Sequence, residues 1–167
     1  MGRDIHAFVE IKNRKSNEWD AIIPHVVRRN YKNEKITVPV DFWEGRNGEL
    51  FDLLNGEDYE IFEPHRDELN DLSPEVASEF VEAFKNKDAN GYYGFAWTTF
   101  AELYIAYLET PKVKDYAVEW ENDEPKYKTN PLKYIIDRIQ FWVEDLYGEW
   151  DYKKVMTDVR LIYWFDC

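Results

Sequence analysis

Cysteine is almost absent from this sequence: the single Cys167 stands at its last position. One thiol cannot form an internal disulfide, and it cannot build a zinc or redox site of the CxxC type. No apolar run approaches the roughly 20 residues that a membrane-spanning helix needs. Asp4 and His6 interrupt the N-terminus where a secretory signal would carry its apolar region. We therefore expect no signal peptide, no membrane association and a cytoplasmic location.

Catalytic signatures are equally scarce. The 167 residues include only three histidines and none of the GxSxG, HExxH, Walker or GxGxxG patterns. No nucleophile–base pair and no cofactor motif can be argued from these residues. The sequence therefore favours a binding role over an enzymatic one, and we expect no cofactor.

Acidic residues are in large excess: 34 Asp and Glu stand against 21 Lys and Arg, giving a formal net charge of −13. Such a field repels nucleic acid and anionic lipid, so direct nucleic-acid binding is not expected. A surface that imitates DNA stays open as an alternative. Any small anionic ligand would have to be held by a local cluster of Arg and His against the global field.

Aromatic residues are abundant, with 7 Trp, 12 Tyr and 10 Phe. They bury large areas, so core filling explains most of them, although Tyr and Trp also suit ligand pockets and interfaces. The length of 167 residues predicts one domain spanning 1–167. The oligomeric state is left open, a homo-oligomer included.

Both ends of the chain alternate in the manner of β-strands. Residues 4–12 place Ile5, Ala7, Val9 and Ile11 on one face, and residues 158–166 place Val159, Leu161, Tyr163 and Phe165 on one face. The turn NRKSN predicts a hairpin over 4–23, and residues 24–40 contain short extended pieces. Residues 111–130 are polar and predict a loop or an irregular hairpin.

Helical signals lie between the two terminal strands. We predict a short helix within 47–56, a helix from Ser73–Pro74 to about Lys87, a helix from Thr99 to Pro111, and a helix over 130–148. The third begins with T-F-A-E, which matches a capping box through Glu102. Apolar stripes at helical spacing mark the second helix, with Val76, Phe80, Val81 and Phe84, and the fourth, with Leu132, Ile135, Ile136, Ile139, Val143 and Leu146. The sequence thus predicts an α+β fold: an antiparallel sheet with paired N- and C-terminal strands, covered by about three helices.

The second face of the two terminal strands is charged. Antiparallel pairing would bring Asp4, His6 and Glu10 across from Asp158 and Arg160. Either this face meets solvent, as one face of such a sheet often does, or helices partly cover it. The apolar residues Phe8, Ile162 and Trp164 among the charges favour partial covering, and covered charges must satisfy one another.

Metal ligation is the weakest interpretation of these charges. Asp4, His6, Glu10 and Asp158 supply one imidazole and three carboxylates, a set that could hold Mn²⁺ or Mg²⁺. Since a D-x-H spacing arises often by chance, a structural hydrogen-bonded set is favoured. A divalent-metal-dependent hydrolase is the last-ranked function.

Cationic and aromatic residues outside the strands offer a ligand-binding interpretation. Arg next to aromatic rings binds anions or nucleobases through forked hydrogen bonds and stacking. In residues 90–99, NGYYGFAWTT, we expect a loop before a helix N-terminus that could hold a planar anion. Without a ligand, the cations could instead neutralise neighbouring carboxylates, and the aromatic residues of 90–99 could form a hydrophobic lid over the core. The candidate ligand-binding residues are Arg28, Arg29, Trp43, Arg46, His65, Arg66, Tyr92, Tyr93, Trp97 and Arg160.

The two ends, GRDIHAFVE and DVRLIYWFD, resemble a family of small uncharacterised bacteriophage and prophage proteins. Its members open with D-I-H-x-F-x-E and close with V-R-hydrophobic-aromatic-W-F-D. GRNGELFDLL, EPHRDEL and YYGFAWTTFAEL match the middle of that family only loosely, and its His/Ser stretch is replaced here by Tyr93 to Ala96. The residues carried over are Asp4, His6, Glu10, Arg160 and Asp166. The resemblance implies a phage protein acting in the cytoplasm of a host bacterial cell, and it implies no reaction.

Two binding functions follow as hypotheses. The first is a non-enzymatic protein that sequesters a small anionic ligand, such as a nucleotide-derived signal, to counter host defence. The second is an acidic inhibitor or DNA mimic that binds a host defence protein directly, with an affinity that collapses as salt rises. The Arg and aromatic content motivates the first, and the net charge motivates the second.

Overall fold

The computed structural model describes residues 4–40, 42, 48–56, 62–67, 69–109, 118–121, 124–127, 131–148 and 151–166. Its elements are β1 (Asp4–Lys12), β2 (Trp19–Ile22), β3 (His25–Arg29), β4 (Lys35–Pro39), α1 (Gly48–Leu54), α2 (Pro74–Lys85), α3 (Lys87–Asn90), β5 (Tyr93–Thr99), α4 (Phe100–Glu109), β6 (Val118–Glu121), β7 (Glu124–Tyr127), α5 (Pro131–Tyr147), α6 (Tyr152–Asp158) and β8 (Val159–Asp166). The predicted α+β class is confirmed.

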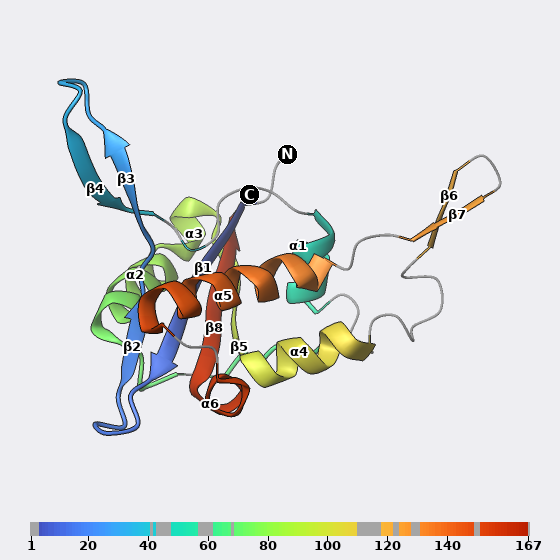
Figure 1. The fold of residues 1–167 in the computed structure, drawn as a ribbon. Coiled ribbons are helices and arrows are strands. Elements are labelled where there is room, and N and C mark those ends of the chain that lie inside the picture. Colours follow the sequence, from blue (N-terminus) through green and yellow to red (C-terminus); the bar gives the residue numbers. More distant parts are fainter. Residues whose placement is uncertain are drawn as a thin grey trace.

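A four-stranded antiparallel sheet in the order β2-β1-β8-β5 forms the centre of the molecule (Figure 1). The terminal strands β1 and β8 pair from Asp4↔Asp166 to Ile11↔Val159, so the predicted pairing of the two chain ends is confirmed. The predicted hairpin over 4–23 is also confirmed, because β2 pairs with β1 through the register Val9↔Ile22 to Lys12↔Trp19. The sheet is thus organised by its two terminal strands.

One face of the sheet is largely apolar and is covered by α1, α4 and α5, with α5 crossing in front of β1 and β8 in Figure 1. The predicted apolar faces of the terminal strands form this core, which holds Ile5, Ala7, Val9, Ile11, Val159, Leu161, Tyr163 and Phe165. The α5 stripe is buried at Ile135, Ile139 and Val143, but Leu146 is 46% exposed. The last turn of α5 therefore extends past the core.

The opposite face of the sheet is covered by α2, so the partial covering expected from its apolar residues is confirmed. Phe80 of α2 packs edge-on against Trp164 of β8 and Phe95 of β5, at ring-centroid distances of 5.9 and 5.3 Å. The apolar stripe predicted for this helix is only partly buried. Val81 and Phe84 are 43% and 49% exposed. The helix rests on the sheet along one narrow line, and the rest of its apolar surface faces outward.

Residues 93–99 correct the expectation of a loop: they form β5, an edge strand paired with β8. The strand alternates, with Ala96 and Thr98 buried on the core side and Phe95 and Trp97 on the other. Gly94 obscures the alternation, because it has φ +66° and lies at an irregularity of the ladder between Tyr93 and Ala96. A glycine bulge in an edge strand thus has the local sequence of a loop.

The four predicted helices are present as α1, α2, α4 and α5, and within the described residues the short α3 and α6, which were not predicted, join them. The predicted strand over 158–166 begins one residue later, as Asp158 belongs to α6. The extended pieces within 24–40 are the hairpin β3–β4, and the described parts of 111–130 form the hairpin β6–β7. No helix among the described residues is long and apolar enough to cross a bilayer.

Candidate functional site

A buried ion-pair network ties the start of α2 to the charged face of the sheet. Arg160 Nε donates to Glu10 Oε2 at 2.6 Å, and Arg160 Nη1 and Nη2 donate to Asp71 Oδ1 and to its carbonyl at 2.9 and 3.1 Å. The other oxygen of Glu10 accepts from the Ser73 N–H at 2.6 Å, and the Trp19 ring lies 3.9 Å from the guanidinium carbon. These five residues, Glu10, Trp19, Asp71, Ser73 and Arg160, are called the Arg160 network below.

The geometry of the Arg160 network assigns it a structural role. Glu10 is fully buried and Arg160 is 3% exposed, and each group faces a partner of opposite charge or a hydrogen-bond donor. Burial alone would raise the pKa of Asp71, but the hydrogen bonds from Arg160 and Trp19 outweigh it and hold that pKa below its usual value. The candidate ligand-binding residue Arg160 is therefore a structural cation.

The four candidate metal ligands do not come together. His6 Nε2 lies 2.9 Å from Asp166 Oδ2, and the Asp4 N–H donates to the other oxygen of Asp166 at 3.3 Å. Glu10 belongs to the Arg160 network. Across the part of the chain that the structure describes, no group of three His, Cys, Asp or Glu side chains could hold a metal ion. The predicted set of one imidazole and three carboxylates is dispersed over the sheet.

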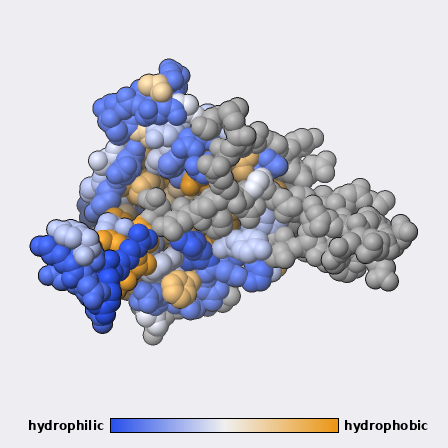
Figure 2. Space-filling view, turned by 90° about the horizontal axis from the view of Figure 1, so that it is seen from above, coloured by the Kyte–Doolittle hydropathy of each residue, from blue (hydrophilic) through white to orange (hydrophobic). Residues whose placement is uncertain are grey.

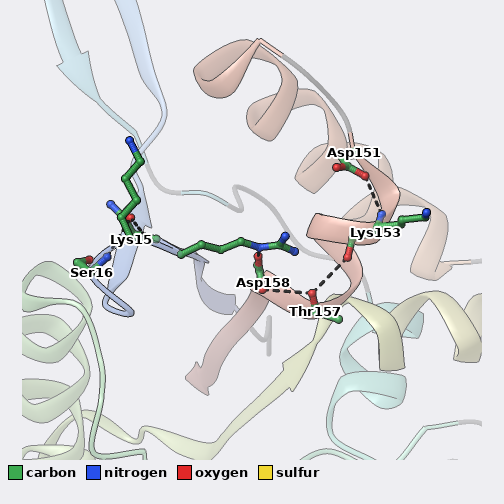
Figure 3. A network of polar contacts seen from close by, with 8 residues as sticks. Lys15, Ser16, Asp151, Lys153, Thr157 and Asp158 are labelled. Atoms are coloured by element: carbon green, nitrogen blue, oxygen red, sulfur yellow. Dashed lines mark hydrogen bonds and ion pairs between the residues drawn. The ribbon is translucent and has the colours of Figure 1, made fainter.

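Asp158, the fourth candidate ligand, joins the end of α6 to the β1–β2 turn. Its carboxylate pairs with Arg14 and accepts from the Thr157 hydroxyl at 3.2 Å, and Figure 3 shows this contact beside the turn that carries Lys15 and Ser16. At the other end of α6, the Asp151 carboxylate caps the helix by accepting from the Lys153 N–H at 3.0 Å. Asp158 thus fastens a helix to a turn.

The ten candidate ligand-binding residues divide into separate places. Arg28 and Arg29 lie on β3, in the hairpin that projects from the body (Figure 1). Tyr92 meets the His6 ring edge-on at 5.5 Å, and Tyr93 packs against the core. Trp43 and Arg46 lie outside the described residues. Among the candidates that the structure describes, His65, Arg66 and Trp97 converge at the edge strand β5.

His65 is held against β5 by backbone and side chain. It exchanges two backbone hydrogen bonds with Trp97, at 3.0 and 2.9 Å, and their rings stack with centroids 4.3 Å apart. His65 Nε2 lies 2.6 Å from Glu102 Oε1. Because the segment before Arg66 pairs with the free edge of β5, the position of Arg66 beside Trp97 is fixed by strand geometry.

Glu102 completes the predicted capping box of α4. Its Oε2 accepts from the Thr99 N–H and from the Thr99 hydroxyl, both at 2.8 Å, while its own N–H donates to Thr99 Oγ1 at 3.2 Å. Partial burial would raise the pKa of Glu102, but the hydrogen bonds from Thr99 and His65 lower it below its usual 4.5. The carboxylate therefore stays ionised and orients His65.

A pocket of about 410 Å³ opens between this segment, β5 and α2, and we call it the Trp97 pocket. Figure 2 shows that hydrophobic residues on the described surface gather in small patches among mainly hydrophilic ones. The Trp97 pocket combines aromatic and apolar walls with cations at its margin. It is lined by Arg66, Asp67, Leu69, Asn70, Leu72, Phe80, Val81, Phe84, Lys85, Phe95, Ala96 and Trp97.

Two polar groups at the Trp97 pocket are of chemical interest. The Trp97 Nε1–H is buried and has no hydrogen-bond partner among the described residues. Arg66 Nη2 donates to the Asn55 carbonyl oxygen at 2.8 Å. Arg66 also lines both the Trp97 pocket and a neighbouring polar hollow of about 550 Å³. A buried donor without an acceptor is costly, so a ligand would be favoured if its binding brought an acceptor within reach of this N–H.

Several residues of the Trp97 pocket were not predicted as site residues. Phe80, Phe84 and Val81 were assigned to the apolar stripe of a helix, Phe95 was placed in the expected loop over 90–99, and Lys85 was not named. One sequence signal could have found them. The helix is short, and its apolar stripe has four residues, more than such a helix can bury against one sheet. The pairing of His65 with Trp97 depends on a contact between residues 32 positions apart, which no local pattern shows.

Neither a protein-family model, nor a curated protein, nor a solved structure matches this chain.

Proposed function

We propose that this protein binds a small anionic ligand with a planar ring in the Trp97 pocket and does not transform it. The observation that carries the proposal is the lining of the pocket, where Arg66 and Lys85 stand beside aromatic walls that include Trp97, whose buried Nε1–H has no partner among the described residues. A nucleotide-derived molecule supplies what these groups need: an acceptor for the indole N–H, negative charge for the cations and a flat ring for the walls.

Charge near the pocket differs in sign from the charge of the chain. Arg66 and Lys85 line the pocket beside one carboxylate, Asp67, and Lys87 Nζ lies 4.5 Å from the centroid of the Phe84 ring. In a chain of net charge −13, this local excess of cations would hold an anion against the global field. Guanidinium groups bind phosphate or carboxylate oxygens through paired hydrogen bonds.

The walls of the pocket suit a planar ring. Phe95 meets Phe80 and Phe84 edge-on, with centroids 5.3 and 5.2 Å away, so three rings lie around one hollow. Phe84 keeps 49% of its surface exposed, which leaves apolar area for a ligand to cover. A volume of about 410 Å³ falls within the range of small-molecule pockets, about 300–1,000 Å³.

The test is a thermal-shift and calorimetry screen of the purified protein against mononucleotides, ADP-ribose and cyclic dinucleotides. A ligand present at 100 times its Kd stabilises the folded state by about 2.7 kcal/mol, which raises the Tm by roughly 5–10 °C. Recovery of the intact ligand after denaturation would separate binding from turnover. No shift with any of these compounds would overturn the proposal.

Matched variants locate the binding. Arg66→Met removes the cation and keeps the length of the side chain, and we expect it to abolish the shift. Trp142→Phe alters a partly buried tryptophan of α5 outside the pocket and should leave the shift unchanged. Equal loss of binding in both variants would argue against this pocket.

We further propose that the setting is a phage-infected bacterial cell, where sequestering a nucleotide-derived signal would blunt host defence. The support is the resemblance of the two terminal strands, with Asp4, His6, Glu10, Arg160 and Asp166, to a phage and prophage family. Expression of the chain in a bacterium that carries a nucleotide-signalling defence tests this. Unchanged protection against phage would contradict it.

A further inference from the structure

The hairpin β3–β4 carries charge opposite to that of the body. Residues 25–39, called the arm below, hold the four cations Arg28, Arg29, Lys32 and Lys35 against the single carboxylate Glu34. The arm therefore has a net charge of +3 in a chain whose net charge is −13. It projects away from the sheet in Figure 1. Such a division of charge favours a contact between the arm and an acidic surface.

The arm is exposed on both faces. Val27 and Tyr31 are 66% and 92% exposed, and Ile36 is 39% exposed. Among the described strands, β3 and β4 pair with each other alone, from His25↔Pro39 to Arg29↔Lys35. An isolated two-stranded ribbon is marginally stable in water, and exposed apolar residues at its tip mark contact surfaces. The arm thus has the composition of one half of an interface.

A cleft of about 490 Å³ lies where the arm leaves the body, and we call it the arm cleft. Aromatic residues Phe8, Phe42 and Trp164 line it, and Glu75 and Glu79 of α2 contribute exposed carboxylates. The Trp164 Nε1–H is buried and has no hydrogen-bond partner in the described part of the chain. The cleft therefore offers apolar surface and negative charge at one place.

A strand edge also borders the arm cleft. β8 pairs with β1 from Asp4 to Ile11, whereas β2 pairs with β1 only from Val9 to Lys12. No described strand pairs with residues 5–8 on the side away from β8, and these four residues line the cleft. Such an edge can accept backbone hydrogen bonds from an incoming extended segment.

We propose that the arm of one copy of this protein seats in the arm cleft of a second copy. Tyr31 and Val27 would cover the aromatic surface, and Lys32 and Lys35 would face Glu75 and Glu79. Because the cleft lies at the base of the arm, a twofold axis nearby lets both copies exchange arms in one isologous interface. Two reciprocal contacts approach the roughly 20–30 residues a side of a stable interface.

A second copy fits the arm better than nucleic acid does. Phosphates would match the cations alone, while the arm cleft also matches the exposed apolar residues of the arm. The acidic body would repel a nucleic-acid chain that extends beyond the arm. Duplex DNA is therefore the competing occupant that the experiment must separate.

The experiment is sedimentation velocity of the full chain at about 50 and 500 mM salt, concentrations chosen because exposed charges are screened over about 10 Å at 0.1 M. We expect a dimer that weakens at the higher salt. K32E/K35E on the arm should be monomeric. The control K15E/K153E makes the same change of net charge at exposed lysines outside the arm and should remain dimeric.

A charge exchange makes the result specific. E75K/E79K should also be monomeric, and an equimolar mixture of E75K/E79K with K32E/K35E should form a heterodimer. Circular dichroism checks that each variant is folded, and a folded, monomeric wild type at 50 mM salt would overturn the proposal. So would a K32E/K35E variant that stays dimeric, or duplex DNA bound through the arm of a monomer.

Discussion

The Arg160 network and the Trp97 pocket lie on the same face of one sheet, and both combine arginine, tryptophan and carboxylate. In the network each oxygen of Glu10 has a donor, and Arg160 is 3% exposed. At the pocket Trp97 keeps a buried N–H without a partner among the described residues, and Phe84 is half exposed. The same residue types thus serve structure where the charged groups pair with one another, and offer binding where cations and aromatic rings border a pocket.

This difference shows why residue type alone does not separate Arg160 from a ligand-binding arginine. A guanidinium with three hydrogen bonds to Glu10 and Asp71 has little left for a ligand. Arg66 donates through Nη2 to Asn55 at the rim of a hollow, and within the described residues its other N–H groups are left for a ligand. The variants below test this difference between the Arg160 network, whose charges are paired, and the Trp97 pocket, whose cations are accessible to a ligand.

Arg160→Met should have the largest effect on stability. It leaves Glu10, which is fully buried, without its cation, and breaking a buried ion pair in this way costs about 3–5 kcal/mol. Urea unfolding followed by fluorescence measures the loss. Because E10Q/R160M removes both charges, it should recover a large part of that loss. A loss below about 1 kcal/mol in the single variant would contradict the structural role of the network.

Gly94→Ala should follow, because the bulge of β5 holds Trp97 at the pocket. Gly94 has φ +66°, and a Cβ there would lie 2.5 Å from Phe165 Cδ2. The positive φ costs about 1 kcal/mol or more, and overpacking adds about 1–3 kcal/mol. Gly91 has a similar φ of +68° with nothing within 4 Å, so Gly91→Ala gives the matched control. Equal losses in the two variants would mean that the contact with Phe165 is unimportant.

The fold could largely be predicted because its main elements carry local signals. Alternation identified β1 and β8, Ser73–Pro74 marked the start of α2, and the T-F-A-E capping box marked α4. The failures have physical causes. β5 was hidden by a glycine bulge, and α6 is a helix of 7 residues, too short to show a period.

The candidate site could be predicted only in part, because its residues meet through long-range contacts. His65, Arg66 and Trp97 were named from composition, and the pairing of His65 with Trp97 brings them together. The same composition also selected Arg28, Arg29 and Arg160, which lie on the arm and in the Arg160 network. Burial and hydrogen-bond satisfaction separate these groups, and neither can be read from a single sequence.

Glu102→Gln should cost about 1 kcal/mol, because the amide weakens the capping of α4 and the contact with His65. The lowered pKa of Glu102 means that its contribution is complete above its usual 4.5 and is lost as the pH falls through and below that value. The gap between wild type and variant should therefore close under acid. Tm values between pH 7 and about pH 3, set on either side of the ordinary Glu pKa, measure it. Glu18→Gln on the exposed β1–β2 turn is the control.

Trp97→Phe should have the smallest effect on stability and the sharpest effect on binding. Phenylalanine keeps a ring that can stack on His65 at the present 4.3 Å, and it removes a buried N–H that has no acceptor within the described residues. The loss of indole area and the relief of an unsatisfied donor oppose each other, so we expect a net change within about 1 kcal/mol. Binding of an anionic ligand should fall about tenfold or more, because a hydrogen bond of about 1.5 kcal/mol is lost. Calorimetry with the ligand found in the screen measures it. Unchanged affinity in a stable variant would place the ligand elsewhere and leave the Trp97 N–H as an unpaired feature of the fold.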